Sequence, residues 1–359
     1  MKVLRYMITA VMLWALAVPV CAQDGNGFSF TDQLESLAET NAEGYVKPLA
    51  TSTGIGLNGG VYRTAKVHRL LGFDISLNVS GILVPDSAKY YTFDTSALGS
   101  TSITVGGSDV SLDLSQLYPS VPDAPTFFGP KETPDLTADE TYARETIVSQ
   151  IAADKGKSED QVNTQYGDDI DNAISQQLPT VPVPQGALDQ GVWAIPSAQA
   201  SVGLPFGTEV NVRYAPPYDL GEEIGELSLF GIGGRISIDQ FIPIPFFPLD
   251  IATGAFFQNI ELGPVKINSN IIHAEISKSL PVFTLYGGVG LESSTLSASY
   301  SFNDPITQTP RDIDISVKGD NKFRGTVGLR MQLLILAINA DYNFAPYKSV
   351  NLGVGLSFR

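Results

Sequence analysis

Three residues with the chemistry of a hydrolytic site alternate along one short segment: His273, Glu275 and Ser277. On an extended strand they share one face, and a base, a carboxylate and a hydroxyl are the groups that nucleophilic catalysis uses. Side chains two residues apart on a strand are separated by about 6.5–7 Å, too far for direct hydrogen bonds between short groups. A triad would need partners from neighbouring strands. The pattern therefore favours a polar row, and we expect no enzyme activity.

Two other polar groupings suggest ligand sites. Asp168, Asp169 and Asp171 could hold Ca²⁺, but they lack the spacing of a calcium loop, so a solvated acidic helix face is favoured. His68 lies in a basic patch, Lys66-Val67-His68-Arg69, for which contact with anionic headgroups and a solvated turn are both open, the turn being favoured. We expect no metal and no cofactor.

Composition excludes several protein classes. The 359 residues include 22 Lys+Arg, 38 Asp+Glu, one cysteine and two histidines, and the formal net charge is −16. A nucleic-acid binder needs Lys/Arg stripes, so no nucleic-acid partner is expected. A single cysteine cannot form an internal disulfide, a Cys-rich zinc site or an iron–sulfur site.

The first residues have the pattern of a secretory signal peptide over 1–22. Lys2 and Arg5 precede an apolar run over 7–20, which is shorter than the ~20 residues of a membrane-spanning helix. We predict cleavage after Ala22, and lipid attachment to Cys21 is the disfavoured alternative. The prediction is an exported protein.

Apolar and polar residues alternate along much of the remaining chain. Near the C-terminus, Val350, Leu352 and Leu356 alternate with Asn351 and Gly353, as side chains on two faces of a strand do. The same period predicts ten strands, at 72–85, 191–202, 207–215, 226–239, 249–261, 266–279, 282–301, 321–332, 335–345 and 348–358. Extra hairpins at 54–65 and 90–116 would raise the number to twelve or fourteen.

Strand length and the charges on the polar face favour a transmembrane antiparallel β-barrel over a soluble sandwich. The segments run to about 9–14 residues, against ~5–6 for ordinary strands. Charged residues in mid-strand suit a wet lumen rather than a dry core, and in lipid such strands must close into a barrel. The predicted lumen-lining residues are Asp74, Glu209, Arg213, Arg235, Asp239, His273, Glu275, Glu292, Arg324, Arg330 and Asp341.

Two segments lie outside the predicted barrel wall, which comprises 72–85 and 190–359. Residues 23–71 contain a short amphipathic helix over 31–39 and a Gly-rich stretch over 54–60, and either a periplasmic plug or a surface tail is open. Residues 86–189 form a predicted extracellular insertion, helical at 136–178, with Asp135 and Ser158 as helix caps and a capping box from Ser158 to Gln161.

The C-terminal Val354, Leu356 and Phe358 resemble the membrane assembly signal of outer-membrane barrels, with one extra residue, Arg359, after the aromatic. The resemblance implies the barrel assembly machinery as a partner. The overall plan of plug, barrel and aromatic-rich wall resembles the long-chain fatty-acid transporter superfamily. The Asn-Pro element of that plug is not evident, and ten strands are fewer than its fourteen. Gly72-Phe73-Asp74, after Ala65–His68, is similar to an uncharacterised outer-membrane barrel family.

These observations predict a protein of the cell outer membrane that passively takes up or binds small hydrophobic molecules. Outer-membrane lipid and a small hydrophobic ligand are its expected partners. A ten-stranded barrel leaves little open bore, so a general porin is disfavoured. The alternatives are a structural or adhesive surface protein without transport and an outer-membrane lipid hydrolase.

Overall fold

The computed structural model describes residues 39–98, 100–132, 136–178, 183–219, 226–244, 248–303 and 310–358. The predicted signal peptide and its cleavage site, all of the predicted helix over 31–39 except Glu39, the cap Asp135 and Arg359 lie outside the described residues. Within the described residues, no helix is long and apolar enough to cross a membrane.

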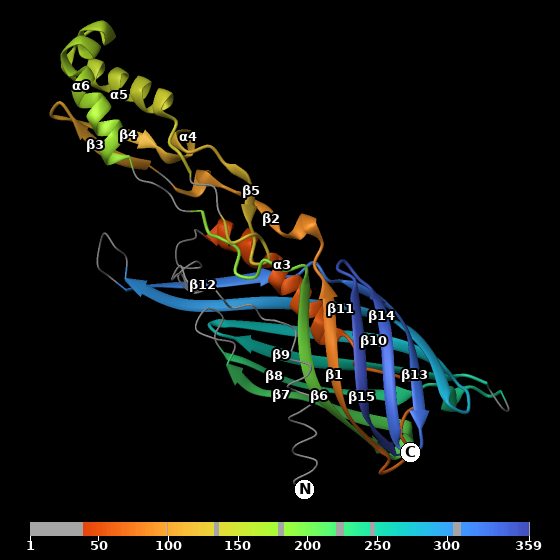
Figure 1. Ribbon diagram of the computed structural model, residues 1–359. Helices are drawn as coiled ribbons and strands as arrows, with labels where there is room; N and C mark the ends of the chain where they lie inside the picture. Colours follow the sequence, from red (N-terminus) through yellow and green to blue (C-terminus); the bar gives the residue numbers. More distant parts are fainter. Residues whose placement is uncertain are drawn as a thin grey trace. The chain divides into compact units, whose positions relative to one another are not determined.

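Ten antiparallel strands close into a barrel (Figure 1). Each strand pairs with its neighbours along the chain, β10 with β11 and β1 with β15 included, so no strand of the ring has a free edge over its whole length. The strands are β1 (Phe73–Leu83), β6 (Val192–Leu204), β7 (Thr208–Asp219), β8 (Glu226–Ser237), β9 (Asp250–Leu262), β10 (Val265–Ser279), β11 (Phe283–Asn303), β13 (Phe323–Leu333), β14 (Leu336–Phe344) and β15 (Ser349–Phe358).

The ten predicted strands are confirmed, and the alternatives with twelve or fourteen are wrong. Residues 54–65 lie in a helix and an irregular segment, and residues 90–116 form strands outside the ring. β12 (Pro310–Lys318) lies outside the predicted strands, and it pairs with the second half of β11, beyond the point where β11 pairs with β13.

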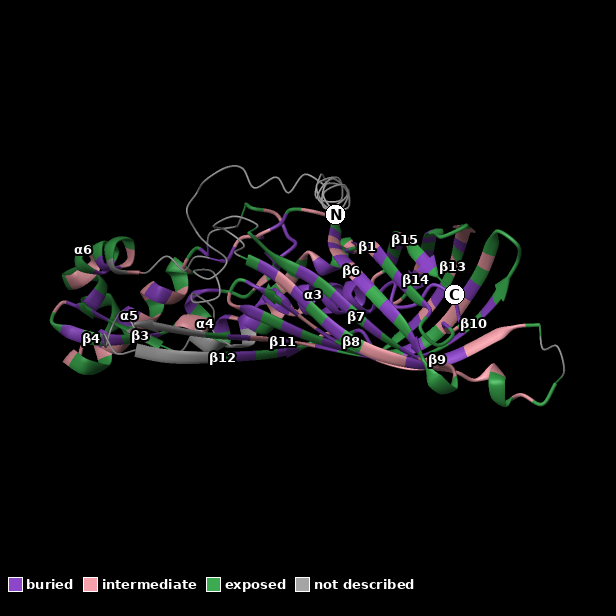
Figure 2. Ribbon diagram, turned by 90° about the horizontal axis from the view of Figure 1, so that it is seen from below, coloured by how far each residue is buried: buried purple, intermediate pink, exposed green. Residues whose placement is uncertain are grey.

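The wall of the barrel is apolar outside and polar inside. Along β1, Asp74, Ser76 and Asn78 are buried while Ile75 is 55 % exposed, and Figure 2 shows the same alternation of buried and exposed residues on other strands. A soluble barrel or sandwich would bury its apolar face instead. This inverted pattern is that of a strand with lipid on one side and a polar interior on the other.

We call the two rims of the barrel the turn end and the loop end. The turn end carries the connections β6–β7, β8–β9, β10–β11 and β13–β14 and the last residue of β15. The loop end carries the connections β1–β6, β7–β8, β9–β10, β11–β13 and β14–β15. Phe73 and Phe358 stack at the turn end with ring centroids 5.0 Å apart.

Helix α3 (Glu39–Asn58) runs through the predicted Gly-rich stretch. Glycine is a poor helix former, but here it allows the helix to approach the wall. A Cβ on Gly54 would lie 2.4 Å from the Cβ of Ser294, and one on Gly56 would lie 2.6 Å from Ile82. The helix therefore fits inside a ten-stranded barrel because glycines, which have no side chain, face Ser294 and Ile82 of the wall in its last turns.

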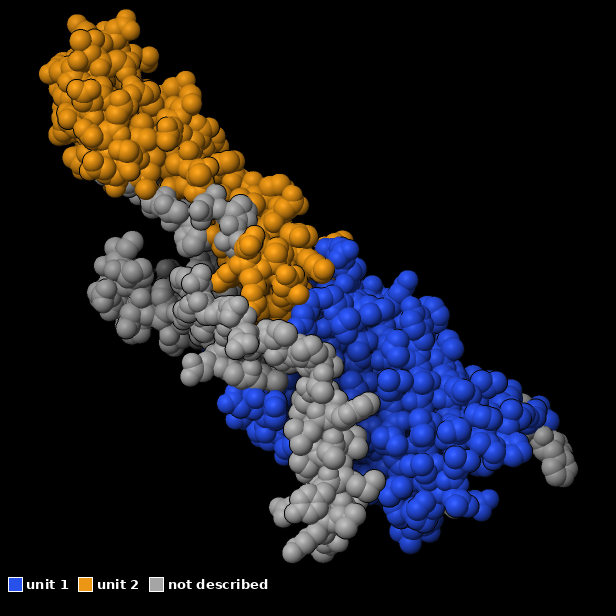
Figure 3. All heavy atoms as spheres, viewed as in Figure 1, with its two compact units in different colours: residues 1–35, 46–86, 190–359 blue, residues 36–45, 87–189 orange. Residues whose placement is uncertain are grey.

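The chain divides into two compact units, drawn in two colours in Figure 3. The first contains the barrel and residues 46–86. The second comprises residues 36–45 and 87–189 and holds η1 (Asp86–Ala88) from Ser87 on, β2 (Tyr90–Phe93), η2 (Thr95–Leu98), β3 (Ser100–Val105), β4 (Ser108–Asp113), α4 (Leu114–Leu117), β5 (Val121–Pro125), α5 (Glu140–Lys155) and α6 (Glu159–Gln177). Two further short helices, η3 (Pro205–Gly207) and η4 (Asp239–Phe241), lie at the turn end of the first unit.

The second unit has its own buried core. Phe127, Phe128, Leu112 and Ile147 are fully buried in it. The capping box at Ser158 and Gln161 is confirmed, whereas the cap of α5 is Asp139, whose carboxylate accepts hydrogen bonds from the backbone N–H groups of Thr141 and Tyr142. A segment that buries aromatic side chains and caps both helices is a folded module rather than a loop.

Candidate functional site in the barrel lumen

Residues 46–70 fill the lumen, and we call them the plug. At the loop end, the backbone N–H of Asp320 donates to Thr51 (3.0 Å), and the indole of Trp193 donates to Thr53 (3.2 Å). At the turn end, the backbone N–H of Ala65 donates to the hydroxyl of Ser277 (3.0 Å). The plug therefore runs the length of the barrel, with α3 nearer the loop end and an irregular segment nearer the turn end.

Side chains of the wall satisfy the end of α3. The last four carbonyls of a helix have no partner within it and carry partial negative charge, so cations there are stabilising. Arg213 donates to the carbonyls of Leu57 (2.6 Å) and Gly59 (3.1 Å), and Gln258 donates to Leu57 (2.7 Å). Arg324 donates to the carbonyl of Ile55. The inward arginines thus hold the plug by its backbone.

A buried acid balances one of these arginines. Glu292 accepts a hydrogen bond from Arg324 (3.1 Å) and another from the Asn58 amide (3.0 Å), and its carboxylate is fully buried. A buried charge is tolerated only when it is paired and hydrogen-bonded, so these three groups depend on one another.

The irregular part of the plug carries its own cation to the wall. Arg63 donates to Asp74 (2.7 Å) and Asn78 (3.2 Å) and also contacts Ser76, all on β1. The guanidinium of Arg330 contacts the other carboxylate oxygen of Asp74 at a longer distance (3.4 Å). This plug-to-wall ion pair is almost fully buried on both sides.

A second ionic group holds the plug near the turn end. Arg235 contacts Glu209 (2.9 Å) and Glu275 (2.8 Å) and donates to the carbonyl of Thr64. Glu209 also accepts from the ring nitrogen Nδ1 of His68 (2.7 Å) and from its backbone N–H (3.0 Å). His68 is 3 % exposed. The interpretations of a solvated turn or a headgroup contact at His68 are therefore wrong, because the side chain is buried on a luminal carboxylate.

An apolar cluster, shared by the wall and the plug, interrupts the polar lining. Phe256, Ile271 and Tyr286 of the wall form a buried cluster with Val61 and Tyr62 of the plug. The Tyr62 ring lies 6.3 Å from Tyr286, edge to face, and its other neighbour is the ring of His273, stacked at 4.8 Å. Such ring pairs add about 0.5–1.5 kcal/mol beyond their buried area.

The row His273, Glu275 and Ser277 does not assemble into a catalytic triad. His273 stacks on Tyr62, Glu275 contacts Arg235, and Ser277 accepts from the backbone of the plug. No hydrogen bond joins any two of the three residues among the bonds found in the described residues. His273 and Ser277 contact the plug directly, whereas Glu275 contacts Arg235, which in turn donates to the plug carbonyl of Thr64.

The other predicted residues have clear positions. Ten of the eleven predicted lumen-lining residues are buried and inward, whereas Asp239 lies in η4 at the turn end and is half-buried. Val354, Leu356 and Phe358 lie on the outer face.

Four residues that line the lumen or belong to the plug were not predicted from the sequence: Tyr62, Arg63, Gln199 and Gln258. Gln199 lies inside a predicted strand and alternates with its apolar residues, so the strand pattern could have identified it as inward-facing. The plug residues lie outside the predicted strands, so that pattern could not identify them.

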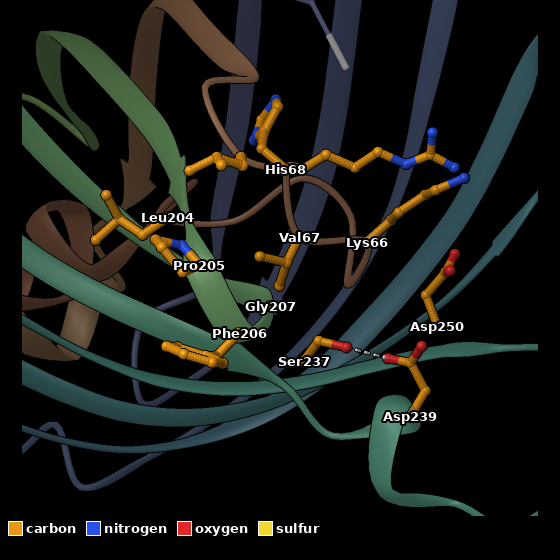
Figure 4. A pocket seen from close by; sticks show the side chains of 12 residues that line it. Lys66, Val67, His68, Leu204, Pro205, Phe206, Gly207, Ser237, Asp239 and Asp250 are labelled. Atoms are coloured by element: carbon orange, nitrogen blue, oxygen red, sulfur yellow. Dashed lines mark hydrogen bonds between the residues drawn. The ribbon is translucent and has the colours of Figure 1, made fainter.

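A cavity of about 350 Å³ lies between the plug and the turn end. Figure 4 shows its lining, which includes Lys66, Phe206, Asp239 and Asp250. Deeper in the lumen, the space between plug and wall shrinks to about 10 Å³, enough for about one water molecule. No cluster of three or more His, Cys, Asp or Glu side chains suited to a metal ion occurs among the described residues.

Residues 1–358 match the family of unknown function DUF6588. The chain belongs to this family. No curated protein matches the sequence.

Solved structures that are similar to this family member include outer-membrane proteins. An OmpT loop-deletion mutant of Vibrio cholerae aligns at 12 % identity and a TM-score of 0.23, over 47 % of this chain and 55 % of OmpT. The chain thus spans about half the length of that relative. The KdgM porin aligns at 8 % identity and 0.24, over 46 % of this chain and 93 % of KdgM. The attachment protein Ail of Yersinia pestis aligns at 12 % and 0.21, over 42 % and 91 %. The assignment of a barrel fold to this chain rests on the pairing of its own strands and not on these alignments.

Proposed function

We propose that this protein is an outer-membrane barrel that binds small apolar molecules in its lumen and lets them pass when the plug leaves its position. The apolar outer wall supports the membrane placement, since a surface with Ile75, Leu352 and Phe358 exposed would otherwise face water. The plugged lumen supports gated rather than open passage. No catalytic role is proposed.

The observation that carries the proposal is the apolar cluster around Tyr62. A lumen that only conducted water and ions would need no cluster of Phe256, Ile271 and Tyr286 among its charges. Tyr62 packs in this cluster as an apolar ligand would, so ligand and plug compete for one place. The wall residues of the cluster define the polarity of the ligand, which is small and apolar or aromatic.

The test is conductance and solute uptake by Tyr62→Ala in planar bilayers and liposomes. Removal of the ring vacates its place in the cluster and deletes its stacking on His273, so we expect more frequent opening and faster uptake of a small aromatic solute such as phenol. Tyr214→Ala is the matched control, because that ring is 50 % exposed on the outer face. Equal conductance and uptake for wild type, Tyr62→Ala and a variant lacking residues 46–58 would refute the proposal.

A surface or adhesive role is the second candidate, and the folded second unit favours it. The backbone N–H of Val84 donates to the carbonyl of Gly191 (2.9 Å), so a short turn could join β1 to β6 without the intervening module. If residues 87–189 serve attachment, such a deletion will abolish binding of whole cells to a host surface while heat-modifiable gel migration of the barrel stays unchanged. The hydrolase candidate predicts that His273→Ala lowers lipid hydrolysis in isolated outer membranes, whereas we expect no change.

A further inference from the structure

The cavity at the turn end, which we call the mouth pocket, has the size and composition of a ligand site. Its volume of about 350 Å³ falls in the range of about 300–1,000 Å³ that small-molecule sites occupy. It lies between plug residues 66–70 and the connections β6–β7 and β8–β9, at the turn end of the barrel.

The charged side chains of the mouth pocket are not paired with one another. Among the described residues, Lys66 and Arg69 form no ion pair, and Asp239 and Asp250 contact no cation. Deeper in the lumen the situation is the opposite, since Arg235 contacts two carboxylates. Two free cations and two free anions around one cavity leave both signs of charge available to a ligand.

The carboxylates are held in place although they have no cation. Asp239 accepts hydrogen bonds from the Ser237 hydroxyl (2.8 Å) and the backbone N–H of Ile251 (3.3 Å). Asp250 accepts from the hydroxyls of Ser277 and Ser279 at 3.4 Å. Oxygen atoms oriented in this way lose little conformational entropy when a ligand cation arrives.

The apolar side of the pocket carries a strained aromatic residue. Phe206 has a φ of 62°, a left-handed conformation that is unusual for a bulky side chain, and it is 89 % exposed. In Figure 4 its ring lies on one side of the pocket, while the Lys66 ammonium and the Asp250 carboxylate lie on the other. Strain that presents an aromatic ring to solvent beside a cavity points to a contact with a ligand.

We propose that the mouth pocket binds a small zwitterion with an apolar side group, of the class of the apolar amino acids. Lys66 and Arg69 bind its carboxylate, Asp239 and Asp250 bind its ammonium, and Phe206 with Val67 contacts its side group. This assignment rests on the proposed function and deepens it, because it names a class of solute, a zwitterion with an apolar side group, that enters the lumen from this rim.

The test uses radiolabelled L-phenylalanine and the detergent-solubilised full chain in equilibrium dialysis. L-Phenylalaninamide lacks the carboxylate, and N-acetyl-L-phenylalanine lacks the ammonium. Each should compete about fivefold more weakly than L-phenylalanine, because the loss of one exposed ion pair changes affinity by about that factor. Lys66→Ala should weaken L-phenylalanine about fivefold and leave the amide unchanged. Asp250→Asn should weaken L-phenylalanine and leave the N-acetyl compound unchanged.

Matched controls are Lys348→Ala, an exposed lysine in the β14–β15 connection, and Asp314→Asn, an exposed aspartate of β12. Neither should alter binding, and heat-modifiable migration of every variant reports an intact barrel. Absence of saturable binding by wild type overturns the proposal, as does equal competition by all three compounds. Stronger competition by glycerophosphoethanolamine than by L-phenylalanine would also overturn it, because the pocket would then recognise a lipid headgroup. If L-phenylalanine does not bind but Tyr62→Ala opens more often than wild type, the mouth-pocket proposal fails and the proposed function still stands.

Discussion

Arg63→Met tests whether the plug is held as the contacts indicate. The substitution keeps an unbranched apolar side chain and removes the ion pair with Asp74. In that pair the Arg63 side chain is 6 % exposed and the Asp74 side chain 2 % exposed. Breaking a buried pair costs about 3–5 kcal/mol. Asp74 keeps its contact with Arg330 at 3.4 Å and is not left uncompensated, so we take the lower value, about 3 kcal/mol.

That free energy shifts the local opening of the plug by about a hundredfold, since about 1.4 kcal/mol corresponds to a factor of ten. Hydrogen exchange of the solubilised chain, read by mass spectrometry on peptides covering residues 59–68, measures the opening directly. These amides include those of Ala65 and His68, which donate to Ser277 and Glu209 of the wall. Amides of α3 should change less, because Arg213 and Arg324 still hold the helix.

Lys47→Met is the matched control in the same segment. Lys47 pairs with Asp320 at 3.4 Å, but the two side chains are 39 % and 61 % exposed, and such a pair contributes less than about 1 kcal/mol. Exchange in this control should stay within about fivefold of wild type. If Arg63→Met also stays within that range while its barrel runs normally on a gel, the buried pair does not retain the plug, and the reasoning is refuted.

Two further substitutions test the wall and the second unit. Gly233→Ala would place a Cβ 2.2 Å from the Phe256 ring and should lower the free energy of unfolding by about 1–3 kcal/mol in urea. Gly234→Ala is the control, because its Cβ would have its nearest neighbour at 3.3 Å, and it should change the free energy of unfolding little. Equal urea midpoints for the two variants would contradict the close contact at Gly233. Ser158→Ala removes the capping box with Gln161 and should cost about 1 kcal/mol in the second unit. Unchanged thermal unfolding followed by circular dichroism would show that this cap does not stabilise α6.

The barrel could be predicted from the sequence because each strand carries its own signal. The alternation of Leu352 and Leu356 with polar neighbours fixes which face meets the apolar surroundings, whatever strand lies beside it. β12 alternates too, with Ile315 and Val317 opposite Asp314 and Ser316, so the same period could have identified it as a strand. Its place could not be predicted, because it pairs with the half of β11 that extends beyond β13.

The plug could not be predicted in the same way, because its conformation depends on the lumen around it. The stretch from Gly54 to Gly60 has low helical propensity, yet Gly54 and Gly56 lie in a helix. Wall side chains supply the hydrogen bonds that the end of the helix lacks, and the glycines provide the space. The sequence could show that charged residues line the interior, but not that their partners are backbone atoms of a segment far away in the chain.

The way in which the wall holds the plug bears on whether the plug can leave. Arg213, Arg235 and Arg324 each donate to a plug carbonyl rather than to a plug side chain. If the plug moves, water can replace those carbonyls around each guanidinium, and two of the three arginines keep their wall carboxylates. In a dry protein core the same separation would leave buried charges without partners. A polar lumen therefore lowers the free-energy cost of release, and this argument supports the proposed gate over a permanent core.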